Sequence, residues 1–139
     1  MAELSIGATQ VLSGADAEFF QGIAGQAVTA GQAVYLDSLS HRLRLADANG
    51  SQDSAEVVGI TLHQADAEQP LRIQTAGTLT LGATAAPVVS TVYIVGGNPG
   101  GIAPVGDKVI GWHTSVIGVG AANHTLKMAL FPSRTVQVA

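Results

Sequence analysis

The segment AVYLDSLSHRLRLA, residues 33–46, decides the fold class. Two short runs with the composition of strands, AVYLD (33–37) and RLRLA (42–46), are separated by a turn. In the second run leucine alternates with arginine, as it does in a strand that buries one side and exposes the other. Two such runs joined by a few turn residues form a β-hairpin. The segment therefore predicts a hairpin, and similar patterns recur along the chain.

Short apolar runs bounded by Gly, Asn, Asp or Pro continue to residue 131, and no window holds the spacing of a capped helix. The nearest helical segment, 15–20, is too short and too close to glycines. Reversals are expected at Ala30-Gly31, Ala76-Gly77 and Asn98-Pro99-Gly100-Gly101, because glycine accepts positive φ. The expected strands are 26–29, 33–37, 42–46, 55–62, 70–75, 78–81, 91–95, 100–103, 114–120 and 125–131.

This pattern predicts an all-β fold: a small β-barrel or β-sandwich of short antiparallel strands and hairpins, with extended terminal arms. A weak repeat divides the expected β domain into two similar units, because Val34-Tyr35 and Val92-Tyr93 each begin a strand that is followed by a turn and a second strand. Gly59 follows Tyr35 by 24 residues (59 − 35) and Gly118 follows Tyr93 by 25 (118 − 93). We expect an N-terminal arm and lead-in segment at 1–25, a β domain of two similar units at 26–131 and a C-terminal tail at 132–139.

Composition narrows the partners of the chain. Its 139 residues suit one domain that buries roughly 68% of its extended surface. Only 12% of the residues are charged, about half the ordinary share. The six Lys and Arg are scattered and form no basic stripe that could neutralise a phosphate backbone, so nucleic acid is not an expected partner. No apolar run reaches the roughly 18 residues of a membrane span, and no export signal is evident. The absence of cysteine rules out disulfides and thiolate metal sites.

The residue types that carry catalysis occur without the spacing that catalysis needs. His41, His63, His113 and His124 fall in separate expected hairpins with no metal-binding motif. Ser38, His41 and Asp37 are too close in one turn to form a triad, and His63 with Asp66 and Glu68 reads better as a polar turn. We therefore expect no enzyme activity, no catalytic or metal site and no cofactor.

Apolar side chains at the ends of the chain are the best candidates for an interface. If Phe19-Phe20 is extended, the two rings point to opposite faces, so one enters the domain and the other stays outside unless a partner covers it. Trp112 reads as a core or rim residue. The candidate contacts to a capsid or to another subunit are Leu4, Ile6, Phe19, Phe20, Trp112 and Phe131.

Turn glycines and strand residues between about Gly25 and Leu130 occur in a definite order: AGQAVYLD (30–37), LRLADA (43–48), VGITL (58–62), QPLRIQTAG (69–77), VYIV (92–95), GGIAP (100–104) and IGV (117–119). This order resembles the small decoration, or cement, proteins of tailed bacteriophages. The resemblance implies a β-rich protein, commonly a homotrimer, that binds the major capsid protein on the outside of the mature head. It implies that the chain is made in the bacterial cytoplasm and ends in the virion.

A second interpretation remains open, namely a carbohydrate- or cell-surface-binding β-module of a phage fibre or other virion appendage. Such a module needs exposed aromatic rings on one face. Trp112, Tyr35 and Tyr93 are the available rings, and both tyrosines fall inside expected strands.

Overall fold

The computed structural model describes residues 11–14, 16–37, 39–47, 56–81, 91–96, 100–104, 115–121 and 125–131. Within these ranges the secondary structure is strand and turn without helix, which confirms the predicted all-β class. The antiparallel sheet curls into a half-barrel. Its strands are β1 (Leu12–Ser13), β2 (Glu18–Ile23), β3 (Ala33–Leu36), β4 (Leu43–Leu45), β5 (Gly59–Thr61), β6 (Pro70–Thr80), β7 (Val92–Val95), β8 (Ile102–Pro104), β9 (Val116–Ala121) and β10 (Thr125–Phe131).

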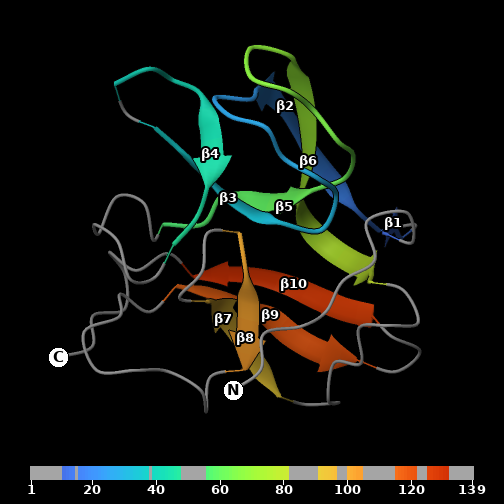
Figure 1. The fold of residues 1–139 in the computed structure, drawn as a ribbon. Helices are drawn as coiled ribbons and strands as arrows, with labels where there is room; N and C mark the ends of the chain where they lie inside the picture. Colours follow the sequence, from blue (N-terminus) through green and yellow to red (C-terminus); the bar gives the residue numbers. More distant parts are fainter. Residues whose placement is uncertain are drawn as a thin grey trace, which may run out of the picture.

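The strand order is β4-β3-β5-β6-β10-β9-β7-β8, with β1 and β2 also paired to β6. The order is the same when it is followed inward from either end. One half has the hairpin β3–β4, then β5, then β6, and the other half has the hairpin β7–β8, then β9, then β10. The two halves meet where β6 pairs with β10. Figure 1 shows the half with β2 to β6 above the half with β7 to β10.

The segment 33–46 forms the predicted hairpin. Tyr35 pairs with Arg44 and Leu36 with Leu43, and the buried Leu43 alternates with the half-exposed Arg44. The turn is closed by backbone bonds between Asp37 and Arg42 and between His41 and Asp37, each 2.8 Å long. His41 has a φ of +58°, which an extended run of residues would not tolerate. The polar turn therefore ends both strands.

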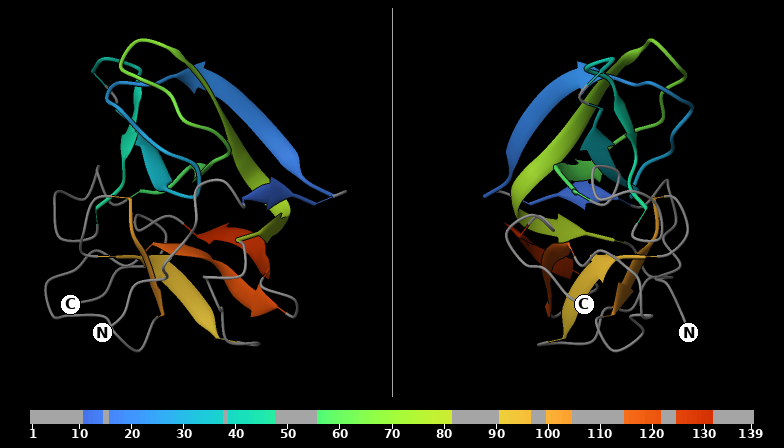
Figure 2. Two further views of the ribbon diagram at one scale, coloured as in Figure 1. Left: turned by 45° about the vertical axis from the view of Figure 1, so that its right-hand side comes forward. Right: turned by 90° about the vertical axis from the view of Figure 1, so that its left-hand side faces the viewer.

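One strand, β6, belongs to both halves, and Figure 2 shows it running from one to the other. Its first part pairs with β5 and β2, and its last part pairs with β10 and β1. The predicted reversal at Ala76-Gly77 is wrong, because the chain stays extended through Gly77. Gly77 does have a positive φ, +93°, but inside a strand this produces a bend rather than a turn.

Two side chains hold the bend of β6. The Asp16 carboxylate accepts a bond from the Thr78 N–H (2.9 Å) and lies 3.4 Å from the Thr78 hydroxyl. The buried Gln74 amide donates to the carbonyl oxygens of Ala76 (3.1 Å) and Thr78 (3.0 Å). Backbone groups that the bend takes out of the ladder are satisfied in this way.

Acidification is expected to weaken this support. The Thr78 N–H bond is the main cause that holds the pKa of Asp16 below its ordinary value of 3.8. The ionised carboxylate therefore adds stability above 3.8, and this contribution is lost as the pH falls through the lower folded pKa. Asp16→Asn keeps an acceptor oxygen but not the charge, so its melting temperature should lie below that of the wild type near neutral pH, and the gap should close as the pH falls through the lowered pKa of Asp16. Asp16→Ala, which lacks the acceptor, should melt lower than the wild type at neutral pH and in acid. A gap that widens in acid would contradict this account.

Two apolar clusters form the core. The larger joins the halves, because Ile60, Leu79, Tyr93, Ile117 and Leu126 all pack in it. The smaller lies inside the half with β2 to β6 and consists of Ala24, Val28, Val34, Leu43, Ala65, Leu71 and Ile73. Backbone bonds from Ala33 to the Gly100 oxygen (3.1 Å) and from Gly100 to the Ala46 oxygen (2.7 Å) also cross between halves. The halves therefore form one packed unit.

The segment before residue 30 differs from the expectation. Residues 26–29 were expected to form a strand, but only Val28 makes a β-bridge there, to Ala65. The strand is instead β2, whose Phe19-Phe20 pair is typical of a strand. Ala24 then makes a parallel bridge to Leu43, which brings the end of β2 to β4 and closes that half around its cluster. Within the expected arm 1–25, β1 and β2 are thus part of the sheet, while 1–10 and 132–139 lie outside the described residues.

Candidate binding surface

Large apolar side chains are exposed on β2 and on the β3–β4 hairpin. The exposed fraction is 41% for Phe19, 45% for Phe20, 41% for Leu36 and 90% for Leu39. The other such side chain in the described ranges is Val119 on β9, at 36%. Exposed apolar side chains that gather on neighbouring elements indicate an interaction surface more strongly than scattered ones do.

Phe19 and Phe20 point to opposite sides of β2, as their pairing with Gln74 and Ile73 of β6 requires. Neither ring is buried, so the expectation that one enters the domain is wrong. The interior beside Phe20 is already filled, because a Cβ on Gly22 would lie 2.9 Å from Leu43 and 3.2 Å from the Phe20 ring. Phe20 therefore stays at the rim of the smaller cluster.

On the other side of β2, the Phe19 ring carries a charged neighbour. The Arg72 guanidinium lies 4.1 Å from the ring centroid, a cation–π contact. No other described strand pairs with the outer edge of β2. We call this part, made of Phe19, Arg72 and the outer edge of β2, the Phe19 face. Exposed Phe and Arg side chains beside the unpaired edge of a strand form a surface suited to protein contact.

On the Phe20 side, the surface is hollowed. A groove of about 230 Å³ is lined by Phe20, Leu36, Val58 and Thr75, and we call it the β2–β3 groove. Its polar lining group among these residues is the Thr75 hydroxyl, which donates to the Glu18 carbonyl oxygen at 3.4 Å. The groove thus offers apolar contact and little that could orient a polar ligand.

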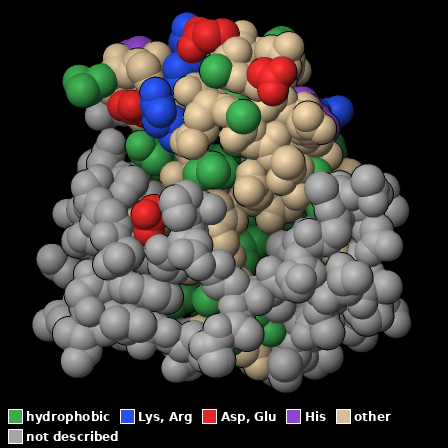
Figure 3. Space-filling model, in the orientation of Figure 1, with side chains coloured by type: hydrophobic (Ala, Val, Ile, Leu, Met, Phe, Trp, Pro, Cys, Tyr) green, Lys and Arg blue, Asp and Glu red, His purple; other side chains and the backbone are tan. Residues whose placement is uncertain are grey.

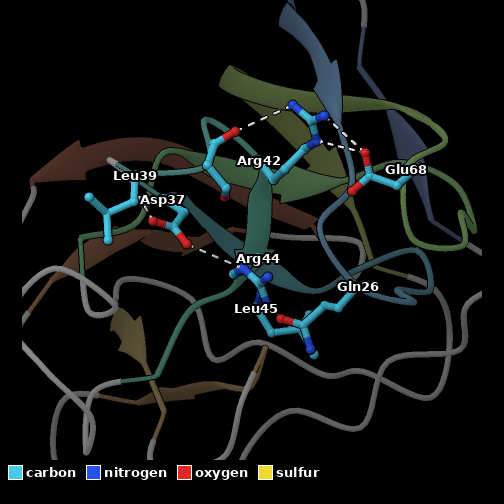
Figure 4. A network of polar contacts seen from close by, with 8 residues as sticks. Gln26, Asp37, Leu39, Arg42, Arg44, Leu45 and Glu68 are labelled. Carbon is cyan, nitrogen blue, oxygen red and sulfur yellow. Dashed lines mark hydrogen bonds and ion pairs between the residues drawn. The ribbon is translucent and has the colours of Figure 1, made fainter.

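Charged side chains beside this surface are paired with one another (Figure 4). Arg42 donates from Nε and Nη2 to Glu68 Oε1, at 3.0 and 2.9 Å. Arg44 Nε lies 3.4 Å from Asp37 Oδ2, an ion pair without hydrogen-bond geometry. The bond and charge of Arg42 lower the pKa of Glu68, and the Leu39 N–H is the main cause that lowers the pKa of Asp37. In Figure 3 the coloured Lys, Arg, Asp and Glu side chains at the top of the visible face belong to the half with β2 to β6.

Three of the polar residues considered for chemistry, His63, Glu68 and Asp37, make structural contacts, while Ser38, His113 and His124 lie outside the described residues. The Nε2 of His63 accepts the Arg72 N–H at 3.0 Å, so Nδ1 carries the proton and donates to the Gln64 oxygen at 2.9 Å. Glu68 pairs with Arg42, and Asp37 accepts the Leu39 N–H. Among the described residues no group of His, Asp and Glu is placed to hold a metal ion.

The sequence named part of this surface and missed the rest. Phe19 and Phe20 lie on it, and Phe131 ends β10 opposite Val116, with its side chain outside the description. Leu4, Ile6 and Trp112 lie outside the described residues. Leu36, Leu39, Val58 and Thr75 were not predicted from the sequence. For Leu39 a signal existed, since a leucine between two serines in a predicted turn has no strand side to bury it.

The chain matches no family model, no curated protein and no solved structure. In the part of the chain that the structure describes, no helix is long and apolar enough to cross a membrane. The fold and the surface together define an all-β protein with exposed apolar side chains on β2 and the β3–β4 hairpin.

Proposed function

We propose that this protein is a head decoration protein of a tailed bacteriophage. In this role it binds the outer surface of the major capsid lattice as a homotrimer and stabilises the mature head. The observation that carries the proposal is the Phe19 face. A half-exposed phenylalanine under an arginine, on a strand with an unpaired outer edge, is a surface that gains from being covered by another protein.

The order of motifs supports the same function. The stretches that resemble cement proteins contain the strands β3, β4, β5, β7 and β8, so the resemblance lies in residues that form the sheet. The charge distribution adds to this support. Charged side chains are few, and Arg42 is paired within the chain, so recognition rests on apolar and backbone contacts more than on charge.

Co-sedimentation with expanded heads that lack their decoration protein tests the proposal. Wild-type protein is expected to bind at saturable sites. Phe19→Ser removes the apolar anchor and should weaken binding on the order of tenfold, the effect of losing an aromatic hot spot. Val119→Ser is the matched control, since it also removes an exposed apolar side chain, on β9, and should change binding less than about twofold.

Three results would count against this function. Wild-type protein could ignore the heads, the two variants could lose binding equally, or the protein could bind a glycan array and not the heads. The last result would favour the carbohydrate-binding module. That alternative has little support from Tyr93, one of its candidate rings, which is only 2% exposed.

A further inference from the structure

The β3–β4 hairpin holds a leucine out in the solvent. Leu39 is 90% exposed, far more than the other exposed apolar side chains on β2 and this hairpin. Figure 4 shows it beside Asp37, with its side chain directed away from the sheet. An isolated exposed leucine is ordinary on a flexible surface. The turn that carries Leu39 is, however, closely held.

Asp37 fixes this turn from several directions. Its carboxylate accepts the Leu39 N–H at 2.9 Å, its carbonyl oxygen accepts the His41 N–H at 2.8 Å, and its own N–H donates to the Arg42 oxygen at 2.8 Å. Arg44 lies against the same carboxylate. A side chain presented on a fixed turn loses little conformational freedom when it binds. Leu39 is therefore a preorganised apolar knob.

The β2–β3 groove has the size and lining of a receptor for one such side chain. At about 230 Å³ it is below the roughly 300 to 1,000 Å³ of sites for drug-sized ligands. It exceeds the cavity of about 150 Å³ that can hold benzene, which is larger than a leucine side chain. Phe20, Leu36 and Val58 supply apolar walls, and the Thr75 hydroxyl is already bonded to Glu18.

We infer that Leu39 of one copy inserts into the β2–β3 groove of a second copy of this chain. Leu39 does not fill the groove of its own chain, because its side chain is almost fully exposed. Each copy carries one knob and one groove, so it can give one contact and receive one. Such contacts satisfy every copy when they close into a symmetric oligomer. The contact uses the Phe20 side of β2 and leaves the Phe19 face for another partner.

The mass of the isolated full-length protein, followed by light scattering over a range of concentrations, tests the contact. Wild-type protein should exceed the monomer mass of 14.0 kDa. Leu39→Ser should raise the concentration needed for association on the order of tenfold or more, as expected for the loss of one buried leucine. Val119→Ser should leave it unchanged. A wild type that stays monomeric, or a Leu39→Ser variant that associates like the wild type, would overturn the inference.

A second experiment reports the position of the contact rather than its strength. The chain contains no cysteine, so single cysteines can be introduced without background. A mixture of Leu39→Cys and Thr75→Cys proteins should form a mixed disulfide under mild oxidation, because each protein can only bond to another copy. Lys127→Cys, exposed on β10, replaces Thr75→Cys in the control mixture. Equal yields in the two mixtures would refute the contact.

Neither experiment contains a capsid, so both test self-association separately from head binding. Failure of head binding with an intact mixed disulfide would reject the decoration role and retain the self-contact. A monomer that still binds heads, with no preference in the disulfide test, would overturn the self-contact and the homotrimer of the proposed function while retaining the head binding.

Discussion

Gly77→Ala is expected to destabilise the protein by about 2 to 6 kcal/mol, from backbone strain of about 1 to 3 and a forced backbone shift of similar size. Gly77 has a φ of +93°, and a Cβ there would lie 2.5 Å from the Asp16 carbonyl oxygen and 2.7 Å from its carbon. Both neighbours are backbone atoms, so no side chain can rotate away. Urea unfolding at neutral pH measures the change in free energy. A typical domain has a total of only about 5 to 15 kcal/mol, so the variant should be close to unfolding.

Gly100→Ala provides the matched control. Gly100 has a similar φ, +79°, but its Cβ would meet the end of the Leu45 side chain at 3.0 Å, which can move, and the Gln32 Cβ at 3.1 Å, which needs to shift by only a few tenths of an ångström. Only the strain of about 1 to 3 kcal/mol should therefore remain. If the two variants lose equal stability, the close approach of the β1–β2 link to the bend of β6 is not what makes glycine necessary at position 77.

Tyr93→Ala is expected to lower the free energy of unfolding by about 3 to 5 kcal/mol, the range for removing a large buried ring. Tyr93 is 2% exposed and lies in the cluster that joins the two halves. Urea unfolding monitored by circular dichroism gives both the midpoint and the slope, and an unchanged slope would indicate that the cooperative unit is intact.

Tyr35→Ala is the control for Tyr93, because both tyrosines follow a valine at the start of similar sequence units. Tyr35 is only partly buried and packs against the edge of the same cluster. Tyr35→Ala should therefore lower the free energy of unfolding by clearly less than Tyr93→Ala does. Equal losses would mean that the joining cluster is not the main contributor to stability.

The sequence was informative wherever local chemistry decides the structure. The alternation of leucine and arginine at 43–45 and the glycines at 31 and 100 predicted the hairpin and turns that form. It failed where distant segments decide. Gly77 reads as a turn residue in isolation, and only the pairing of β6 with β5, β2, β10 and β1 keeps the chain extended there. Residues 26–29 have strand composition but find only one bridge.

For the candidate surface too, the part set by neighbouring residues could be predicted from the sequence and the part set by distant segments could not. The Phe19-Phe20 pair stands out in the sequence because two adjacent rings cannot both face one core. The β2–β3 groove cannot be read from sequence, since Phe20, Val58 and Thr75 are far apart along the chain and meet only after β2 and β5 have paired with β6. The stacking of Arg72 on Phe19 depends on the same pairing.

The sharing of β6 by both halves also bears on how the chain folds. The described strands that pair with β6 are β1, β2, β5 and β10, and they are spread along the sequence. β10 begins 45 residues after β6 ends (125 − 80). Pairings between such distant segments raise the contact order, and chains with high contact order fold slowly. On the ribosome, the β10 side of β6 stays unpaired until the later half has been synthesised. An exposed strand of this kind invites aggregation, so the yield of folded protein should depend on how quickly synthesis delivers β10.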